Sequence, residues 1–165
     1  MQGVTYGGPG GTRYGAAACA VSVPHREIRC RTAPGSGRGH RWLVRVASQV
    51  SPLSPVSSSY AAPSLLSLLP VSPPPPPAGH STEGGVRMRA IGANFGPPGD
   101  DVRLLFGGVA GCGSDPATPA GGAGCPRVVA RDHTSVVFDT PVGEGANLTV
   151  EVQASGVLSN SLDYS

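Results

Sequence analysis

Short runs in which apolar and polar residues alternate recur along the chain. In residues 42–46 (Trp-Leu-Val-Arg-Val), Trp42, Val44 and Val46 fall on one side and the residues between them on the other. Residues 148–152 (Leu-Thr-Val-Glu-Val) and 86–90 (Val-Arg-Met-Arg-Ala) follow the same alternation. Successive side chains of a β-strand point to opposite faces, so this period of two is typical of half-buried strands. We predict a strand in each of the three segments.

The segments between these runs are rich in glycine and proline. The chain of 165 residues holds 25 Gly and 18 Pro, and the glycines follow no collagen-like period. Both residue types are unfavourable inside helices and common in turns. The composition therefore favours short strands joined by many turns, as in a β-sandwich, over long helices.

Two parts of the chain repeat one order of segments. The first part contains Val-Thr-Tyr-Gly-Gly at 4–8, Glu-Ile-Arg-Cys-Arg-Thr-Ala-Pro-Gly-Ser-Gly at 27–37, the strand at 42–46, and Ser-Tyr at 59–60. The second contains Leu-Leu-Phe-Gly-Gly at 104–108, Ser-Val-Val-Phe-Asp-Thr-Pro-Val-Gly-Glu-Gly at 135–145, the strand at 148–152, and Asp-Tyr at 163–164. Two copies of one fold unit explain this shared order more simply than a single irregular domain.

The second copy begins with residues that have no counterpart in the first. Pro63 opens an apolar segment, Gly84-Gly85 follows as a turn, and a strand then ends in Gly-Ala-Asn-Phe-Gly at 92–96. Together with the Thr-Pro-x-Gly-x-Gly turn at 140–145 and the Val-x-Val strand after it, this set resembles the IPT/TIG family. The resemblance covers nearly the whole chain and implies an all-β fold of immunoglobulin-like β-sandwich modules in tandem.

The resemblance implies two domains. Residues 1–62 match a partial IPT/TIG domain that lacks its first strands, and residues 63–165 match a complete one with a proline-rich loop at 70–79. Since the first copy begins at Val4, we expect the chain to start inside a repeat, with neighbouring IPT/TIG domains in the full-length protein. A sheet without its first strands would leave an open edge and an uncovered apolar face.

The four cysteines fall into two local pairs. A hairpin that turns at Pro24-His25 would place Cys19 opposite Cys30, with about 4.5 Å between the Cα atoms, within reach of a disulfide. Cys112 and Cys125 flank a loop that a second bridge would close. Two such bridges would indicate an oxidising compartment. Four reduced thiols in a cytosolic protein are the alternative. Zinc is disfavoured because no C-x-x-C occurs, and we predict no metal site.

The sequence contains no motif for catalysis or cofactor binding. It has no G-x-S-x-G nucleophile elbow, and no lysine that could complete a phosphate-binding G-x-x-x-x-G-K-[ST] loop. We therefore predict a protein that is not an enzyme and has no cofactor. Asn147 begins an Asn-Leu-Thr glycosylation sequon in the turn before a strand, and we predict modification there if the protein is exported.

Positive charge is concentrated in the first part of the chain. Residues 1–62 have a net charge of +6 and residues 63–165 a net charge of −4. We predict a face for an anionic partner formed by Arg26, Arg29, Arg31, Arg41 and Arg45. An anionic glycan or an acidic protein would suit it, and a solvated face without a partner is the alternative. Nucleic acid is disfavoured because no aromatic residues are interleaved and the second part is acidic.

With the family resemblance, these features predict a non-catalytic structural, adhesion or ligand-binding module of a cell-surface or secreted protein, with a protein or glycan partner. The family leaves two alternatives, a DNA-binding immunoglobulin-like domain of a transcription factor and an accessory carbohydrate-associated domain of a secreted enzyme. Residues 1–15 show no signal peptide. The longest apolar stretch, 60–71, is interrupted by Pro63 and Pro70 and is too short to span a bilayer. An extracellular location would need a signal or anchor outside this chain.

Overall fold

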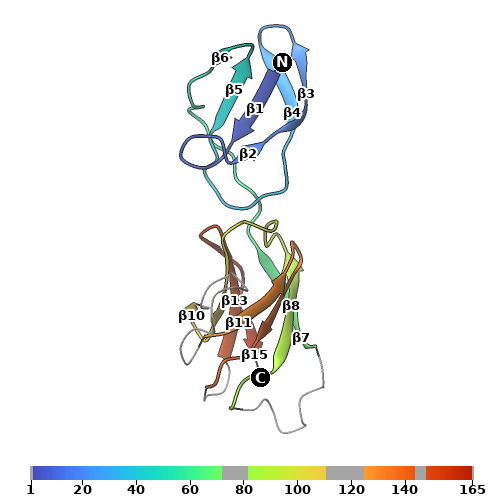
Figure 1. Ribbon diagram of the computed structural model, residues 1–165, viewed down its shortest axis with the longest axis vertical. Helices are drawn as coiled ribbons and strands as arrows, with labels where there is room; N and C mark the ends of the chain where they lie inside the picture. Colours follow the sequence, from blue (N-terminus) through green and yellow to red (C-terminus); the bar gives the residue numbers. More distant parts are fainter. Residues whose placement is uncertain (1, 72–81, 111–124, 144–147, 165) are drawn as a thin grey trace. The chain divides into compact units, whose positions relative to one another are not determined.

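The computed structural model describes residues 2–71, 82–110, 125–143 and 148–164. These residues form fifteen β-strands and no helix (Figure 1), so the prediction of an all-β protein is confirmed. The chain divides into two compact units, Met1–Tyr60 and Ala61–Ser165. The division lies two residues before the domain boundary predicted from the sequence.

The N-terminal unit contains two antiparallel sheets (Figure 1). The larger sheet has the order β2-β1-β5-β6 and is formed by β1 (Gln2–Tyr6), β2 (Tyr14–Gly15), β5 (Trp42–Val46) and β6 (Gln49–Val50). The smaller sheet is a hairpin of β3 (Ala17–Val23) and β4 (Glu27–Arg31). Both the predicted strand at 42–46 and the predicted hairpin turn at Pro24-His25 are present.

Aromatic side chains fill part of the N-terminal unit. The ring of Tyr6, only 1 % exposed, stacks on Trp42 with 4.2 Å between ring centroids. Tyr14, His40 and Tyr60 also contact one another through their rings. The hydroxyl oxygens of Tyr6 and Tyr60 lie 2.5 Å apart, and the Ala33 amide donates to the Tyr6 hydroxyl at 2.8 Å. Buried hydroxyls require hydrogen-bond partners. Because Ala33 lies between β4 and β5, its bond to Tyr6 attaches this connection to the aromatic residues of the unit.

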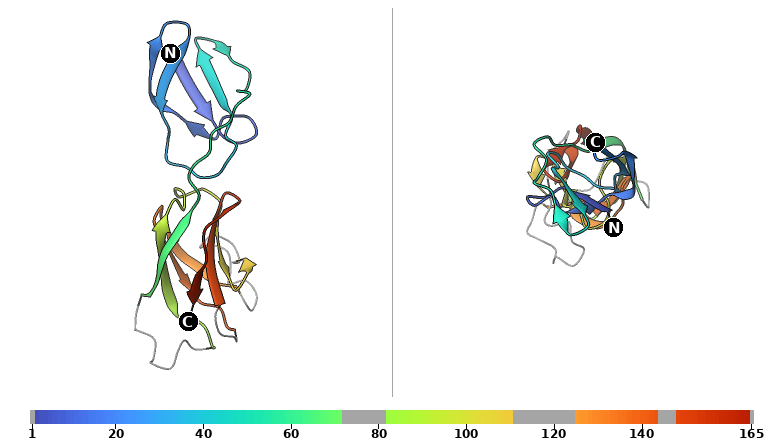
Figure 2. Two further views of the ribbon diagram at one scale, coloured as in Figure 1. Left: turned by 180° about the vertical axis from the view of Figure 1, so that it is seen from behind. Right: turned by 90° about the horizontal axis from the view of Figure 1, so that it is seen from above.

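The C-terminal unit also contains two antiparallel sheets, shown from behind in Figure 2. One has the order β11-β12-β8-β7, formed by β7 (Ser64–Pro70), β8 (Arg87–Ala93), β11 (Arg127–Arg131) and β12 (Ser135–Asp139). The other has the order β10-β9-β13-β14, with β15 also paired to β13; its strands are β9 (Val102–Phe106), β10 (Val109–Ala110), β13 (Leu148–Ala154), β14 (Val157–Leu158) and β15 (Leu162–Tyr164). Both sheets contribute to one core cluster, including Met88, Phe138, Leu104 and Val152.

The Gly-Ala-Asn-Phe-Gly segment at the end of β8 has a steric explanation. A Cβ on Gly92 would lie 2.0 Å from the carbonyl oxygen of Ser64 and 2.5 Å from the ring of Phe95. Phe95 is completely buried, and its amide donates to the His133 carbonyl at 3.0 Å. Asn94 has φ +63°, a conformation that Asn tolerates better than most residues, and its side chain donates to the Ala62 carbonyl at 3.1 Å. Each of these residues therefore has a local role.

The strand registers relate the two units more closely than the sequence alone does. Tyr6 lies opposite Trp42 on β5, and Phe106 lies opposite Val150 on β13. The Gly7 amide donates to the carbonyl of Arg41 at 3.0 Å, and the Gly107 amide donates to that of Thr149 at 2.8 Å. Trp42 thus corresponds to Val150. The alternation pattern of the sequence instead matches segment 42–46 with segment 148–152, which places Trp42 at Leu148, two residues earlier along the strand.

A serine after β6 and another after β14 confirm this correspondence. The Val44 amide donates to the hydroxyl of Ser51 at 3.0 Å, and the Val152 amide donates to the hydroxyl of Ser159 at 2.9 Å. Both serines also donate an amide hydrogen back to the same two strand residues. The sheet containing β5 in one unit and the sheet containing β13 in the other are therefore built alike.

Of the proline-rich loop expected at 70–79, Pro70 ends β7 and Val71 follows it, whereas residues 72–79 lie outside the described residues. That either unit is an IPT/TIG domain stays a prediction.

Candidate recognition site

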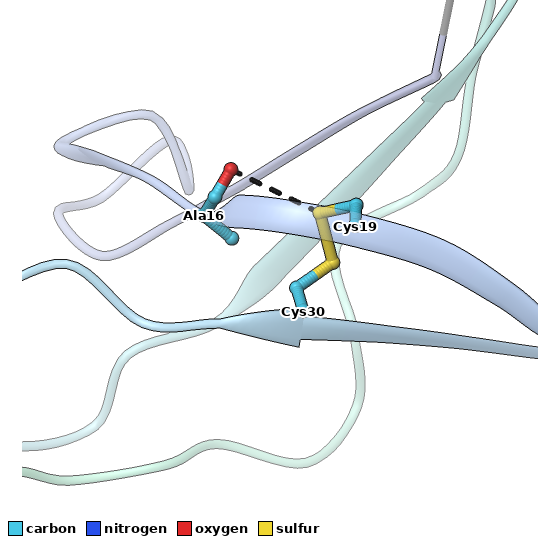
Figure 3. The surroundings of a disulfide bond; sticks show 3 residues. All are labelled: Ala16, Cys19 and Cys30. Atoms are coloured by element: carbon cyan, nitrogen blue, oxygen red, sulfur yellow. Dashed lines mark hydrogen bonds between the residues drawn. A yellow bond between two sulfur atoms is a disulfide. The ribbon is translucent and has the colours of Figure 1, made fainter.

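The hairpin of β3 and β4 is closed by a disulfide. Cys19 and Cys30 are bonded, with 4.1 Å between their Cα atoms (Figure 3), and the hairpin places Val21 opposite Ile28 as predicted. The Sγ atom of Cys19 lies 3.8 Å from the carbonyl oxygen of Ala16. A bridge across two neighbouring strands restricts the unfolded chain and thereby stabilises the folded hairpin.

One edge of this hairpin distinguishes the two units. By register, β4 corresponds to β12: Arg31 lies opposite Ala17 as Asp139 lies opposite Arg127, and Ile28 lies opposite Val21 as Val136 lies opposite Arg131. In the C-terminal unit, β8 pairs with the other edge of β12. In the N-terminal unit, β3 and β4 form a two-stranded sheet, and no described strand pairs with that edge of β4. Within the described residues, the outward amides and carbonyls of this edge have no strand partner.

An apolar groove lies at the turn of the same hairpin. Its volume is about 630 Å³, and it is lined by Val21, Val23, Pro24, His25, Arg26, Glu27, Ile28, Val44 and Val46. We call this the hairpin groove. Val21, Val23 and Val46 are 43 %, 42 % and 46 % exposed, which is high for valines.

Equivalent positions are buried in the C-terminal unit. Val44 and Val46 correspond to Val152 and Ala154, which are 0 % and 1 % exposed. These two belong to the same core cluster as Met88 and Ala90 of β8 and as Phe95, which follows β8. The backbone of Phe95 is bonded to His133, at the turn between β11 and β12, which corresponds to the turn that carries His25. The N-terminal unit therefore has an open groove beside the turn that corresponds to the one bonded to Phe95 in the C-terminal unit.

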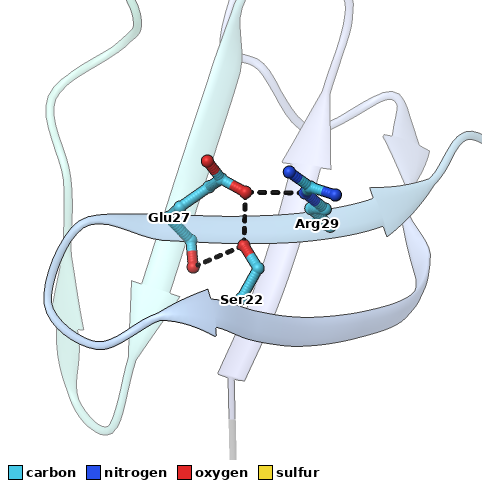
Figure 4. A network of polar contacts seen from close by, with 3 residues as sticks. All are labelled: Ser22, Glu27 and Arg29. Atoms are coloured by element: carbon cyan, nitrogen blue, oxygen red, sulfur yellow. Dashed lines mark hydrogen bonds and ion pairs between the residues drawn. The ribbon is translucent and has the colours of Figure 1, made fainter.

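Charged side chains line the outer side of β4. The Arg29 Nε atom donates to the Glu27 carboxylate at 2.6 Å, and the Ser22 hydroxyl donates to the same oxygen (Figure 4). The bond from Ser22, followed by that from Arg29, lowers the pKa of Glu27 below its usual value. Among the described residues, Arg31 has no ion-pair partner, and both arginines are exposed. The outer side of β4 therefore presents one paired and one unpaired guanidinium.

The five arginines predicted to share a face are divided between two sheets. Arg29 and Arg31 lie on β4, and Arg26 lies at the hairpin turn beside the groove. Arg45 lies on β5, where alternation directs it away from Val44 and Val46, which line the groove. Arg41 directly precedes β5, and the same alternation places it on the side of Arg45. The structure thus brings together three arginines around β4, which we call the β4 arginines.

The remaining predicted site residues lie mostly outside the described residues. Cys112 and the sequon residue Asn147 belong to this group, so neither the second disulfide nor glycosylation is tested. Cys125 is described, and no described cysteine is a free thiol. Within the described ranges, no three His, Cys, Asp or Glu side chains gather in a way that could hold a metal ion. No helix among the described residues is long and apolar enough to cross a membrane.

The sequence did not identify the hairpin groove. Alternation predicts which side of β3, β4 and β5 is apolar, but not whether another strand covers it. The available signal was the absence, in the first copy, of segments equivalent to residues 63–70 and 84–96. An uncovered apolar face was expected on that ground, without its residues.

Comparison with known proteins adds no further information on identity. No protein-family model matches the chain, and no curated protein matches it in sequence.

Proposed function

We propose that this chain is a non-catalytic recognition module of a cell-surface or secreted protein, composed of tandem immunoglobulin-like sandwiches of the IPT/TIG type. The proposal rests mainly on one observation, the Cys19–Cys30 disulfide in an all-β chain whose two units share the same strand registers.

The Cys19–Cys30 disulfide supports the proposed location. Structural disulfides persist in oxidising environments and are rare in the reducing cytosol. The β4 arginines support an acidic partner, because arginine binds carboxylates with a planar set of donors. An acidic protein or an anionic glycan meets this requirement.

Location can be tested with the full-length protein in its own cells. We expect an antibody against this chain, applied before lysis, to label the protein at the surface of intact cells or in the medium. We also expect Cys19 and Cys30 to resist alkylation until a reductant is added. A protein that is labelled only after lysis, with both thiols reactive, would contradict the proposal.

The DNA-binding alternative can be tested with the purified 165-residue chain. Retention on immobilised heparin and on duplex DNA is compared across a salt series, since phosphate contacts make binding strongly salt-dependent. We expect weak retention on both, lost at moderate salt and similar for the two polyanions. Clearly stronger retention on duplex DNA would favour a transcription-factor domain and contradict the surface role.

A further inference from the structure

We propose that the outer sides of the two sheets of the C-terminal unit bind each other between copies of this chain, a basic face of one copy against an acidic face of the next. Such a contact goes beyond the proposed recognition function and does not depend on the location of the protein. Both sheets contribute one side to the shared core and direct the other side away from it. The charges on these outer sides carry the proposal.

Arginines gather on the outer side of the sheet β11-β12-β8-β7. The buried Met88 marks the core side of β8, so alternation directs Arg87 and Arg89 outward, and both are exposed. The register continues this side across the sheet, since Asp139 of β12 lies opposite both Arg87 and Arg127. Along these strands, the outer side therefore carries three guanidinium groups and one carboxylate.

The carboxylate neutralises only one of these arginines. The Arg87 guanidinium makes two hydrogen bonds to the Asp139 carboxylate, at 2.8 and 3.1 Å. Among the described residues, Arg89 and Arg127 form no ion pair. This side of the sheet thus has an excess of positive charge, although residues 63–165 have a net charge of −4.

Apolar side chains surround one of the two unpaired arginines. Arg89 lies between Leu69 of β7 and Val137 of β12 in the register, and Ile91 is the next outward residue of β8. Leu69 is 48 % exposed. Arginine is enriched at protein–protein interfaces, where apolar residues form the centre of the contact. We call the outer side of this sheet the basic face.

The other sheet carries the opposite charge on its outer side. Val150 and Val152 of β13 are completely buried, so Glu151 between them points outward. Asp163 of β15 lies on the same side, opposite Thr149, the preceding outward residue of β13. Among the described residues, neither Glu151 nor Asp163 forms an ion pair. We call this outer side the acidic face.

The acidic face also has apolar neighbours for its carboxylates. Leu105 of β9 lies opposite Glu151, and Leu158 of β14, which is 47 % exposed, lies opposite the next outward residue of β13. Arg103, the arginine of these strands, donates to the Asp101 carboxylate at 3.3 Å and is therefore already paired. The two faces are thus complementary, with two unpaired guanidiniums on one and two unpaired carboxylates on the other, each set among leucines.

The position of the faces determines the type of assembly. Because they lie on opposite sides of one core, each copy would contact one neighbour through its basic face and another through its acidic face. A contact between unlike surfaces generates open chains or rings and no symmetric dimer. Each face is only a few short strands wide, so we expect association to be weak and to decrease with salt.

Sedimentation velocity of the purified 165-residue chain tests the assembly. At low salt, we expect the mean sedimentation coefficient to increase with protein concentration beyond the value of a dimer. At high salt, it should return to the value of a monomer. A chain that stays monomeric at low salt and high concentration, or that stops at a dimer, would overturn the proposal.

Exchange of the charges tests the two faces. Arg89→Glu with Arg127→Glu makes the basic face acidic, and Glu151→Arg with Asp163→Arg makes the acidic face basic. Either double variant alone should associate at least tenfold more weakly, because its two faces then carry charge of the same sign. In an equal mixture, every face meets one of opposite sign, and association should recover, which also shows that both variants are folded. Failure of the mixture to recover would overturn the proposal.

A matched control separates these faces from the basic N-terminal unit. Arg41→Glu with Arg45→Glu makes the same charge change on that unit, and we expect association to stay as in the original chain. If the N-terminal unit instead bound the acidic unit of another copy, this control would lose association. Arg89→Glu with Arg127→Glu would then gain it, and that pair of results would overturn the assignment of the faces.

A variant without a charge change separates the faces from general attraction between charged chains. Leu69→Ser leaves the net charge as it is and removes an apolar neighbour of Arg89. We expect association to weaken several-fold, whereas Val56→Ser, at a position of the N-terminal unit that is 72 % exposed, should leave it unchanged. Circular dichroism would show that both variants keep their strands. Equal association of the two variants would overturn the place assigned to the basic face.

Discussion

The two units share a sheet design but differ in how they complete it. In the C-terminal unit, β8 and β7 extend the sheet beyond β12, and the core behind them is closed. In the N-terminal unit, the corresponding hairpin has a disulfide and no third described strand. Phe138, which is completely buried, occupies the position of Cys30. One unit is thus held by a large apolar side chain at a place where the other has a covalent bond.

The hairpin of β3 and β4 needs a source of stability other than a third described strand. A two-stranded hairpin alone is marginal in water, and the groove beside it leaves valines exposed. The disulfide and the aromatic cluster around Tyr6 offset this loss in the N-terminal unit. We expect substitutions to affect the two units separately, and Trp42, the only tryptophan of the chain, gives a fluorescence signal for the N-terminal unit alone.

The largest effect is expected for Phe138→Ala. Phe138 is 0 % exposed and lies edge-on to Phe106, with 6.5 Å between ring centroids. Truncating a buried aromatic side chain costs about 3–5 kcal/mol, because it removes contacts and leaves a cavity. Hydrogen exchange of β8 and β12 should speed up strongly, while the denaturant transition seen by Trp42 stays in place. Val142→Ala, at a position 63 % exposed, is the control and should change little. A matching shift of the Trp42 transition would contradict the independence of the units.

The disulfide should matter only in the N-terminal unit. The bond closes a segment with a sequence separation of 11, for which the loop-entropy model gives about 3 kcal/mol. Cys19→Ser together with Cys30→Ser should shift the Trp42 transition to lower denaturant and leave the exchange of β8 and β12 unchanged. A Trp42 transition at its original position would show that the aromatic cluster suffices without the bridge.

A smaller loss is expected for Gly92→Ala, which tests the closure of the C-terminal sheet. An added Cβ would meet the Ser64 carbonyl oxygen of β7, so β7 and β8 would have to separate. Overpacking of this kind costs about 1–3 kcal/mol. Gly143→Ala is the matched control, since a Cβ there meets nothing within 4 Å. Urea denaturation followed by tyrosine fluorescence or circular dichroism would compare them, and equal stability of the two variants would refute the steric role of Gly92.

Local features of the fold were predictable from the sequence, and distant ones were not. The Cys19–Cys30 hairpin required only alternation and a turn, both of which are local. The match of β5 with β13 was placed two residues away from the true register, because a shift of two leaves the apolar face of a strand unchanged. The side chain of Asn160, which bonds to both the amide and the carbonyl of Leu65, joins residues 95 apart and has no local signature.

The candidate site could also be predicted only in part: the orientation of side chains within a strand, but not the order of the strands. Alternation correctly directed Arg29 and Arg31 away from Ile28 and Cys30. It could not show that Arg45 belongs to a different sheet, because sheet order depends on pairings between distant segments. The groove depends on the absence of a strand over particular valines, and the C-terminal unit was needed to show which residues such a strand would cover.

The smallest effect is expected in the turn between β11 and β12, which corresponds to the turn that lines the hairpin groove in the N-terminal unit. In the C-terminal unit, the Asp132 carboxylate accepts hydrogen bonds from the amides and hydroxyls of Thr134 and Ser135. These bonds, led by that from the Thr134 amide, lower the pKa of Asp132 below its usual 3.8. A depressed folded-state pKa means that the stabilisation is present above the unfolded-state pKa and is lost as the pH falls through the folded-state value.

Asp132→Ala should therefore reduce the stability of the C-terminal unit at neutral pH by about 0.5–1 kcal/mol, the lower part of the range for a net hydrogen bond, since the turn is exposed. The difference between the variant and the original chain should shrink as the pH falls below 3.8, because protonation removes the acceptor in the original chain as well. Denaturation at several pH values, with His133→Ala as a control in the same turn, would measure this. A difference that stayed constant with pH would mean that the carboxylate charge has no part in the turn. In the turn of the N-terminal unit, Pro24 occupies the position of Asp132 and has no side-chain acceptor, so removing Asp132 would leave the two turns more alike.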